Sequence, residues 1–332
     1  MKTLWREFLE YARFTPSPNN TQPWKFKIIS ESEADLYYDP TRLLPIEDSK
    51  NALTICSLSM FVDTLSLAAS HEGFKVKADF LAKELDAKKS APTLFAKLHL
   101  VKSEEDFDFD RRLIMERRTS RLNYDSKMID QDVVNELIAI AKKYGHEFYV
   151  KSDPVTVKSI MDLNRQTIFY DMTNPEIRNE MKTWFRFSDS EVLSKKDGLW
   201  FKCMNIPSYL LGLFFNQESL FEKEPFKSLL LNFYERTMKG TVTVGWLRGP
   251  FTSFDDYINA GILFNRFWLE LAKHKIYIHP FGSLITNPLA HEEFIKKMEI
   301  TEGNSKVWLI LRLGYSETPP KSPRLEVTDI LI

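Results

Sequence analysis

Three arginines and two hydroxyl residues occupy five consecutive positions in the second third of the chain: Arg117, Arg118, Thr119, Ser120 and Arg121. They stand just before a predicted helix, where guanidinium groups, hydroxyls and backbone N–H groups could converge on one phosphate. The arginine fork also matches an oxyanion geometrically. The alternative is a solvated basic turn paired with the acids of the preceding run, 104–110. Composition alone favours this second interpretation.

A second polar segment, PSPNNTQPW, spans residues 16–24. Its prolines fix the backbone, its asparagines and glutamine present amides, and a tryptophan stands at the far end. Such a rigid edge beside apolar surface could bind a planar heterocycle with alternating donors and acceptors, such as an isoalloxazine. The alternative is a turn whose asparagine side chains only cap the backbone.

Other common sites are excluded by the residues present. There is no G-x-G-x-x-G motif, Walker lysine loop, H-E-x-x-H motif or nucleophile elbow, and 11 glycines make a Rossmann phosphate loop a poor fit. The six histidines show no ligand spacing, so no metal site is predicted. Cys56 fits a buried apolar position, and nothing is predicted for Cys203.

Charge and hydropathy describe a globular protein without a polyanion-binding face. The formal net charge is -1, so no overall positive field would attract nucleic acid or an anionic membrane. The N-terminal residues mix charged and apolar types, unlike a signal peptide, and the longest apolar stretch, 206–215, is too short to span a bilayer. Two cysteines give no disulfide framework. A cytoplasmic protein that acts on a small molecule is therefore expected.

Hydrophobic periodicity predicts the elements that must position these segments. Helices are expected over 3–14, 51–71, 131–144 and 255–273, and strands over 24–29, 34–38, 74–80, 93–101, 147–151 and 306–312. The order of elements after the polar run resembles the order before it, so we expect two halves, 1–102 and 103–332. Residues of about 171–240 are an additional helical segment, either a lid or extra packing.

The two polar segments resemble those of the FMN-dependent nitroreductase superfamily, R-R-S-x-R and P-S-x-x-N-x-Q-P-W. In the ordinary family the arginine segment comes first, whereas here it follows. This reversal resembles the fused, Acg-like branch, in which one chain carries two half-copies and imitates a homodimer. The resemblance implies an α+β nitroreductase-like fold, with mostly antiparallel sheets flanked by helices, and one FMN per chain.

The resemblance also assigns site residues. The phosphate would be held by Arg117, Arg118, Thr119 and Arg324, with Lys321 as a further cation, and the first two arginines are expected to be partly exposed. The flavin ring would be approached by Pro16, Ser17, Asn20 and Gln22, and by the loop Pro280, Phe281 and Gly282, whose backbone N–H faces flavin N5. Arg121 would stabilise the reduced flavin. No side-chain acid or base is assigned.

The implied activity is NAD(P)H-dependent reduction of electron-poor acceptors, such as nitroaromatics or quinones, through flavin N5. The main alternative is a non-catalytic FMN-binding protein that stores or sequesters the flavin beneath a lid. A third interpretation is a flavin-free scaffold whose basic turn binds a protein or an anionic metabolite. Fused halves complete their own site, which permits a monomer.

Overall fold

The first sheet is antiparallel and lies within the first third of the chain. In the computed structural model, which describes residues 4–104, 109–216 and 223–332, its strand order is β1-β2-β4-β3. The strands are β1 (Trp24–Ile28), β2 (Glu33–Tyr38), β3 (Phe74–Phe80) and β4 (Thr93–Lys102). Alternating buried and exposed residues in β2 fit a sheet with one face on the core.

The second sheet has the same order of strands along the chain. It runs β5-β8-β10-β9 and is also antiparallel. The strands are β5 (Glu147–Lys151), β8 (Thr243–Pro250), β9 (Tyr277–Pro280) and β10 (Ser305–Gly314). In both sheets, two strands precede a long helix and two follow it.

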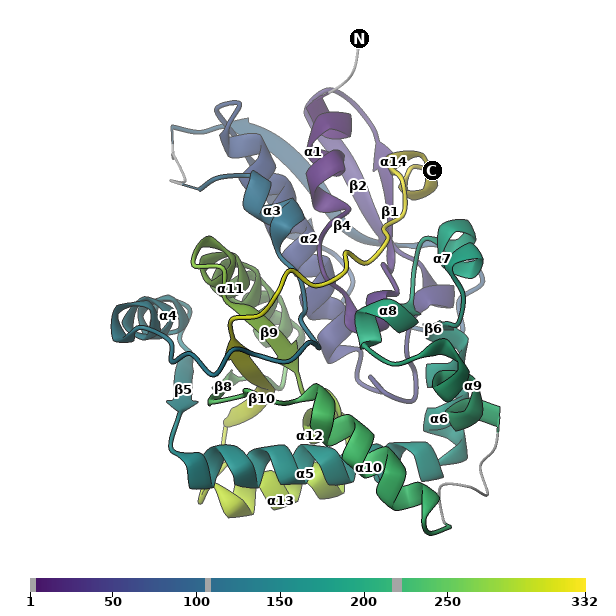
Figure 1. Cartoon of the computed structure of the whole chain (residues 1–332). Helices are drawn as coiled ribbons and strands as arrows, with labels where there is room; N and C mark the ends of the chain where they lie inside the picture. The colour runs from purple at the N-terminus through teal and green to yellow at the C-terminus, as the bar shows by residue number, and fades with distance from the viewer. Residues whose placement is uncertain (1–3, 105–108, 217–222) are drawn as a thin grey trace.

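The two long helices, α2 (Ala52–Ser70) and α11 (Phe254–Lys273), pack against each other at the centre of the molecule (Figure 1). Gly261 allows their close approach, because a Cβ there would overlap Ser59 Oγ and the carbonyl oxygen of Cys56. Of the described helices, α2 alone is long and apolar enough to cross a membrane, with a mean hydropathy of 1.6. In this structure 94% of that stretch is buried, so α2 is a core helix.

Shorter helices cover the sheets. On the first sheet lie α1 (Leu4–Ala12) and α14 (Val327–Ile330), and beside α11 lie α3 (Arg112–Glu116) and α4 (Gln131–Lys143). Below the second sheet in Figure 1 lie α5 (Pro154–Thr173), α12 (Ser283–Thr286) and α13 (Pro288–Lys297). Two 3-10 turns, Pro18–Asn20 and Pro40–Arg42, flank β1 and β2.

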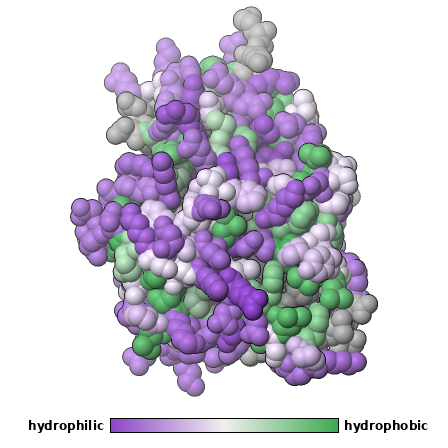
Figure 2. All heavy atoms as spheres, in the orientation of Figure 1, coloured by the Kyte–Doolittle hydropathy of each residue, from purple (hydrophilic) through white to green (hydrophobic). Residues whose placement is uncertain are grey.

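The additional segment is mostly helical, as expected, and lies along the right side of Figure 1. Its elements are α6 (Pro175–Trp184), β6 (Phe185–Arg186), α7 (Asp189–Lys195), β7 (Leu199–Trp200), α8 (Phe201–Met204), α9 (Ser208–Asn216) and α10 (Phe226–Thr237). Strands β6 and β7 pair in parallel. Figure 2 shows hydrophobic side chains gathered over the part of this face where α9 and α10 lie.

The C-terminal tail returns from the second sheet to the first. It crosses the front of the molecule in Figure 1 as a yellow trace that ends beside β1. Leu331 forms a parallel bridge with Phe26, and the N–H of Ile332 donates to the carbonyl oxygen of Phe26 at 3.0 Å. The predicted boundary assigns this tail to the second half, but in space its last residues belong to the first sheet.

Candidate functional site

A cavity of about 450 Å³ lies where the N-terminal turn, the arginine segment, the additional helices and the C-terminal tail meet. Its volume suits a small-molecule ligand or cofactor. Large apolar side chains form much of the lining: Met115, Met181, Phe185, Phe215, Phe233, Phe264, Trp268, Phe281 and Trp308.

The N-terminal turn has a backbone that L-amino acids rarely adopt. Asn19, Asn20 and Gln22 have φ angles of 47°, 54° and 52°, a region that asparagine tolerates better than most residues. The N–H of Gln22 donates to Ser17 Oγ at 2.8 Å, which closes the turn. Pro16, Ser17 and Asn20 line the cavity. The turn therefore presents a constrained edge to it.

Gln22 lies behind the cavity wall. It is fully buried and is not among the lining residues. Its Nε2 donates to the carbonyl oxygen of Lys196 at 3.0 Å, and its Oε1 accepts from the N–H of Leu325 at 2.9 Å. Gln22 was expected to approach a bound ring, but it does not line the cavity. Its side chain instead joins the turn to the additional segment and to the tail.

The arginine segment docks on the edge of the second sheet. The N–H of Ser120 donates to the carbonyl oxygen of Ile278 at 2.9 Å, and Thr119 forms a parallel bridge with Ile278. Arg312 of β10 is fully buried and donates to the carbonyl oxygen of Leu122 at 2.9 Å. These contacts hold the backbone of the segment against the sheet.

All three arginines of the segment line the cavity, as does Thr119. Each arginine side chain donates only to backbone carbonyl groups in the described part of the chain. The acceptors are Phe14 for Arg117 (2.8 Å), Pro319 for Arg118 (2.6 Å) and Cys203 for Arg121 (3.3 Å). The carbonyl groups orient the guanidinium groups without neutralising their charge.

Arg117 is more deeply placed than the sequence predicts. Its exposed fraction is 8%, and its guanidinium carbon lies 4.1 Å from the centre of the Trp268 ring. Burial, and then the neighbouring charge of Arg324, lower the pKa of Arg117 to about 9. The side chain stays charged at neutral pH, in a position where an uncompensated charge is unfavourable. Arg118 is half-buried, in line with the expectation.

The C-terminal tail adds two further cations to the lining, Arg324 and Lys321. Arg324 Nη1 donates to Asn20 Oδ1 at 2.6 Å, and Lys321 Nζ lies 4.2 Å from the centre of the Phe14 ring. Burial lowers the pKa of Arg324 to about 10. Burial, followed by the charge of Arg118, also lowers the pKa of Lys321.

No described carboxylate forms an ion pair with any of these five cations. Asp110, from the acidic run, pairs instead with Arg112 at 2.6 Å, and 105–108 lie outside the described residues. The Nε atoms of Arg118, Arg121 and Arg324 are buried without a hydrogen-bond partner. The described acids of the run 104–110 therefore do not pair with the arginine segment, and the cations of the cavity lining suit an anion.

The loop after β9 lines the cavity, but only one of its three residues has a backbone N–H to offer. Pro280 has none, and the N–H of Phe281 donates to the carbonyl oxygen of Ile310 at 2.8 Å. The N–H of Gly282 has no partner among the described residues, and a Cβ at this position would meet no atom within 4 Å. Of the three residues predicted for this loop, Gly282 is therefore the one whose backbone N–H is available to a ligand.

His279 is a cavity residue that the sequence analysis did not single out. It is 7% exposed, and its Nδ1 has no hydrogen-bond partner. Burial, then the charges of Arg121 and Arg312, lower its pKa well below the ordinary value, so the imidazole is neutral. Arg312 was also missed, although an arginine inside the apolar strand WLILRLG was a signal that a buried cation is held there.

The additional segment supplies one wall of the cavity. Arg186 and Asp197 form a buried ion pair at 2.6 Å, and Arg42 reaches the same carboxylate at 2.9 Å. Asn205 Nδ2 donates to the carbonyl oxygen of Arg121 at 3.0 Å. Both predicted roles of the segment, a lid and extra packing, are compatible with these contacts. Asn205 joins the segment to the arginine segment, and Asp197 joins it to Arg42, which follows β2.

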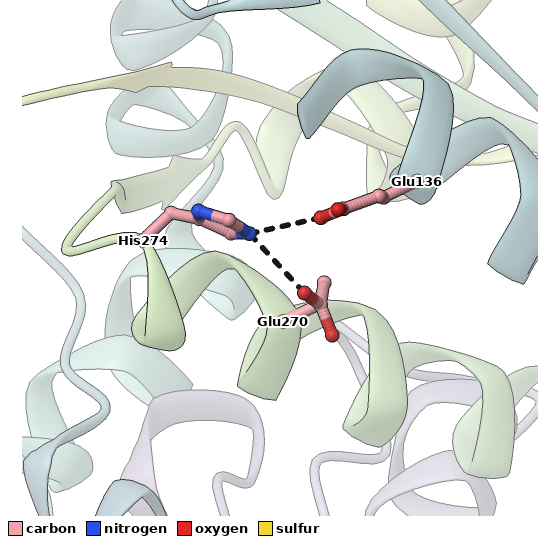
Figure 3. A group of neighbouring side chains, drawn as sticks. All are labelled: Glu136, Glu270 and His274. Carbon is pink, nitrogen blue, oxygen red and sulfur yellow. Dashed lines mark hydrogen bonds and ion pairs between the residues drawn. The ribbon is translucent and has the colours of Figure 1, made fainter. Parts of the chain in front are cut away.

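A separate side-chain group lies between α4 and α11 (Figure 3). His274 Nε2 is 2.9 Å from Glu136 and 3.2 Å from Glu270. Among the described residues, this is the one group of three His, Cys, Asp or Glu side chains with convergent ligand atoms. Lys273 also contacts Glu270 at 3.0 Å. We interpret the group as an ion-paired link between two helices, and none of its residues lines the cavity.

The chain has similarity to known proteins in its structure. No protein-family model matches the chain, and no curated protein does. Solved nitroreductases are similar to it in structure. One of them is a nitroreductase with bound FMN from Bacteroides fragilis, which is 14% identical to this chain with a TM-score of 0.36. The match covers 62% of this chain and 87% of that structure's chain.

Two further solved structures are similar at the same distance. An FMN-dependent nitroreductase from Mycobacterium smegmatis in complex with NADPH is 15% identical, with a TM-score of 0.38, covering 65% of this chain and 94% of its own. An FMN- and NADPH-dependent nitroreductase from Sphigopyxis is 10% identical, with a TM-score of 0.41, covering 67% and 96%. Such distant matches do not identify the chain.

Proposed function

We propose that this protein is an FMN-binding oxidoreductase of the nitroreductase type. The main support is the group of cations in the cavity lining that lack carboxylate partners among the described residues: Arg117, Arg118, Arg121, Lys321 and Arg324. A phosphate monoester carries close to two negative charges near neutral pH, and arginine forks bind such oxyanions through paired hydrogen bonds. The hydroxyl of Thr119 would add a donor.

The remaining lining fits a flat, largely apolar ring system. Pro16, Ser17 and Asn20 would contact one edge of the ring, and the N–H of Gly282 would offer it a hydrogen bond. Aromatic and methionine side chains would cover its faces. A ligand with both a phosphate and an isoalloxazine would use both the cations and the apolar side chains of the lining.

We further propose that the chain is a fused pseudo-dimer with one flavin site. The shared strand order of the two sheets and the pairing of α2 with α11 support this. The turn at 16–24 belongs to the first half and the arginine segment to the second, so one complete site results. Residues 1–15 contain no arginine segment, and residues 145–332 contain no N-x-Q-P-W segment. A cytoplasmic monomer is consistent with this arrangement.

When bound, FMN would supply hydride transfer from NADH or NADPH to an electron-poor acceptor such as a nitroaromatic or a quinone. Arg121 would place positive charge beside the ring edge that becomes negative on reduction. The apolar wall of the additional segment would exclude water from the reacting atoms. The neutral His279 would add no charge of its own.

Anaerobic stopped-flow spectroscopy tests this proposal directly. Purified protein should be yellow and should release about one FMN per chain on denaturation. Mixing with NADPH or with NADH should bleach the flavin absorbance, and a quinone should restore it. Colourless protein that cannot be reconstituted with FMN would favour the flavin-free scaffold.

A second candidate function is FMN storage without turnover. The observation that favours it is that Asp197 and Asn205 join the additional segment, whose side chains line the cavity, to Arg42 and to the backbone of Arg121. A closed wall would exclude the nicotinamide while retaining the flavin. Bound FMN that neither NADPH nor NADH bleaches would establish this function in place of the reductase.

A further inference from the structure

Glu47 is a carboxyl group in the cavity lining that the proposed flavin site does not use. It lies in the loop before α2, far along the chain from every cation of the site. Its Oε2 accepts a hydrogen bond from Asn19 Nδ2 at 2.5 Å. No described residue donates to its Oε1, and no described cation forms an ion pair with it.

Glu180 of α6 is an acidic neighbour of Glu47 whose carboxyl group accepts from two backbone N–H groups. The N–H of Glu47 donates to Glu180 Oε2 at 2.7 Å, and the N–H of Ile46 donates to Oε1 at 3.0 Å. Two backbone donors favour a carboxylate over a carboxylic acid.

Two other carboxyl groups, those of Asp48 and Asp171, raise the pKa of Glu47, and each accepts hydrogen bonds from its own donors. Asp48 accepts from the N–H and the hydroxyl of Thr54, both at 2.8 Å. Asp171 of α5 accepts from the hydroxyl of Ser283 and from the amide of Asn287. Glu47 has a single neutral donor. Of the four carboxyl groups, it is the one on which a proton is best retained.

The electrostatic environment agrees with this geometry. Burial, and then the charge of Glu180, raise the pKa of Glu47 to about 8. Asp171 and Asp48 act in the same direction, and the hydrogen bond from Asn19 opposes them. At neutral pH the group facing the cavity is a neutral carboxylic acid.

We propose that Glu47 is the proton donor of the cavity for a neutral, planar carbonyl acceptor of the quinone class. This rests on the proposed function. The bound cofactor would supply the hydride, and Glu47 would supply the proton to the carbonyl oxygen of the acceptor. The O–H bond of Glu47 breaks as the O–H bond of the product forms, and water returns a proton to the carboxylate. The surrounding acids disfavour an anionic acceptor.

The test is Glu47→Gln in the FMN-loaded protein. Glutamine keeps the size and the hydrogen bond from Asn19 but has no acidic proton. We expect FMN affinity and the rate of flavin reduction by NADPH to stay within about twofold, and reoxidation by a neutral quinone at pH 7 to slow by about tenfold or more, within the usual range for general acids. Glu176→Gln, on the exposed part of the same helix as Glu180, is the control and should match the wild type.

The pH dependence of the reoxidation rate is a second measurement, which would not change if Glu47 had only a structural role. Wild-type reoxidation should slow as the pH rises through about 8, and Glu47→Gln should lose this limb. Glu180→Gln removes the neighbouring charge and should shift the limb to lower pH. An unchanged rate and profile in Glu47→Gln would overturn the inference.

A readout on flavin-free protein separates the two proposals. Infrared difference spectra of wild type against Glu47→Gln should show the protonated carboxyl disappearing near pH 8. If Glu47 instead titrates near its ordinary value of 4.5, this inference fails while the flavin site stands. If the protein binds no FMN, the proposed function fails first.

Discussion

The side-chain oxygen of Asn20 accepts a 2.6 Å hydrogen bond from Arg324, which lies 304 residues later in the chain. The bond joins the turn expected to contact the flavin ring to a cation expected to hold its phosphate. It forms because the tail leaves β10, lines the cavity between residues 320 and 324, and ends beside β1. Both ends of the chain therefore shape one wall of the cavity.

Replacing Arg117 by methionine should weaken FMN binding and stabilise the flavin-free protein. The change removes a buried charge that has no acidic partner among the described residues, while keeping much of the packing against Trp268. Because hydrogen bonds to charged groups contribute about 1.5–3 kcal/mol, we expect FMN affinity to fall about 10- to 100-fold. Fluorescence titration and thermal melts would measure the two effects.

Riboflavin and Arg112→Met provide the controls for this variant. Riboflavin lacks the phosphate, so Arg117→Met should leave its affinity unchanged. Arg112 is exposed and paired with Asp110, and its replacement should alter neither binding nor stability by much. Equal losses for FMN and riboflavin would contradict a phosphate role for Arg117.

Gly282→Pro should impair the flavin site without a steric clash. The φ angle of Gly282 is -53°, close to that of proline, and added atoms at the Cβ position meet open space. The substitution removes the one N–H in this loop that has no protein partner among the described residues. We expect slower flavin reduction by NADPH. Gly282→Ala, which keeps the N–H, should behave like the wild type, and similar behaviour of both variants would refute the assignment.

Asp197→Ala should loosen the additional segment and speed the release of FMN. The change leaves the buried Arg186 with the more distant Glu191, at 4.0 Å, as its acidic partner, and loss of one partner of a buried pair typically costs up to about 3–5 kcal/mol of stability. Dilution of the loaded protein into a flavin trap would measure the release rate. Asp189→Ala removes a pair with Lys202 that is exposed to solvent, and should change little. A release rate unaffected by Asp197→Ala would show that this segment does not retain the flavin.

The stability of the flavin-free protein should fall as the pH rises from about 4.5 to 8. The pKa of Glu47 is raised to about 8, so folding favours its protonated form, and this contribution is lost as the pH passes through the raised pKa. Glu47→Gln should therefore gain stability relative to wild type with increasing pH, by at most about 1.4 kcal/mol per pH unit. Urea unfolding between pH 5 and pH 8.5 would show the trend, and parallel curves would exclude it.

Periodic apolar residues predicted the regular elements closely. The strand predicted over 147–151 is β5 itself, and the long helices predicted over 51–71 and 255–273 correspond to α2 and α11 within one residue at each end. These elements are decided by side-chain spacing and local end signals, such as the capping box at Ser253. Strand β8 was not predicted, although it is buried along most of its length.

The sequence by itself determined which functional groups are present, a cluster of arginines and a turn rich in amides. It also determined most of the helices and strands that carry them. Only the tertiary structure decided which groups meet and which remain unpaired. It buried Arg117 against Trp268, turned Gln22 away from the cavity and set Glu47 beside Glu180. Helix and strand formation depends on neighbours a few residues apart, whereas burial and charge depend on contacts between distant segments, and those exist only once the chain has packed.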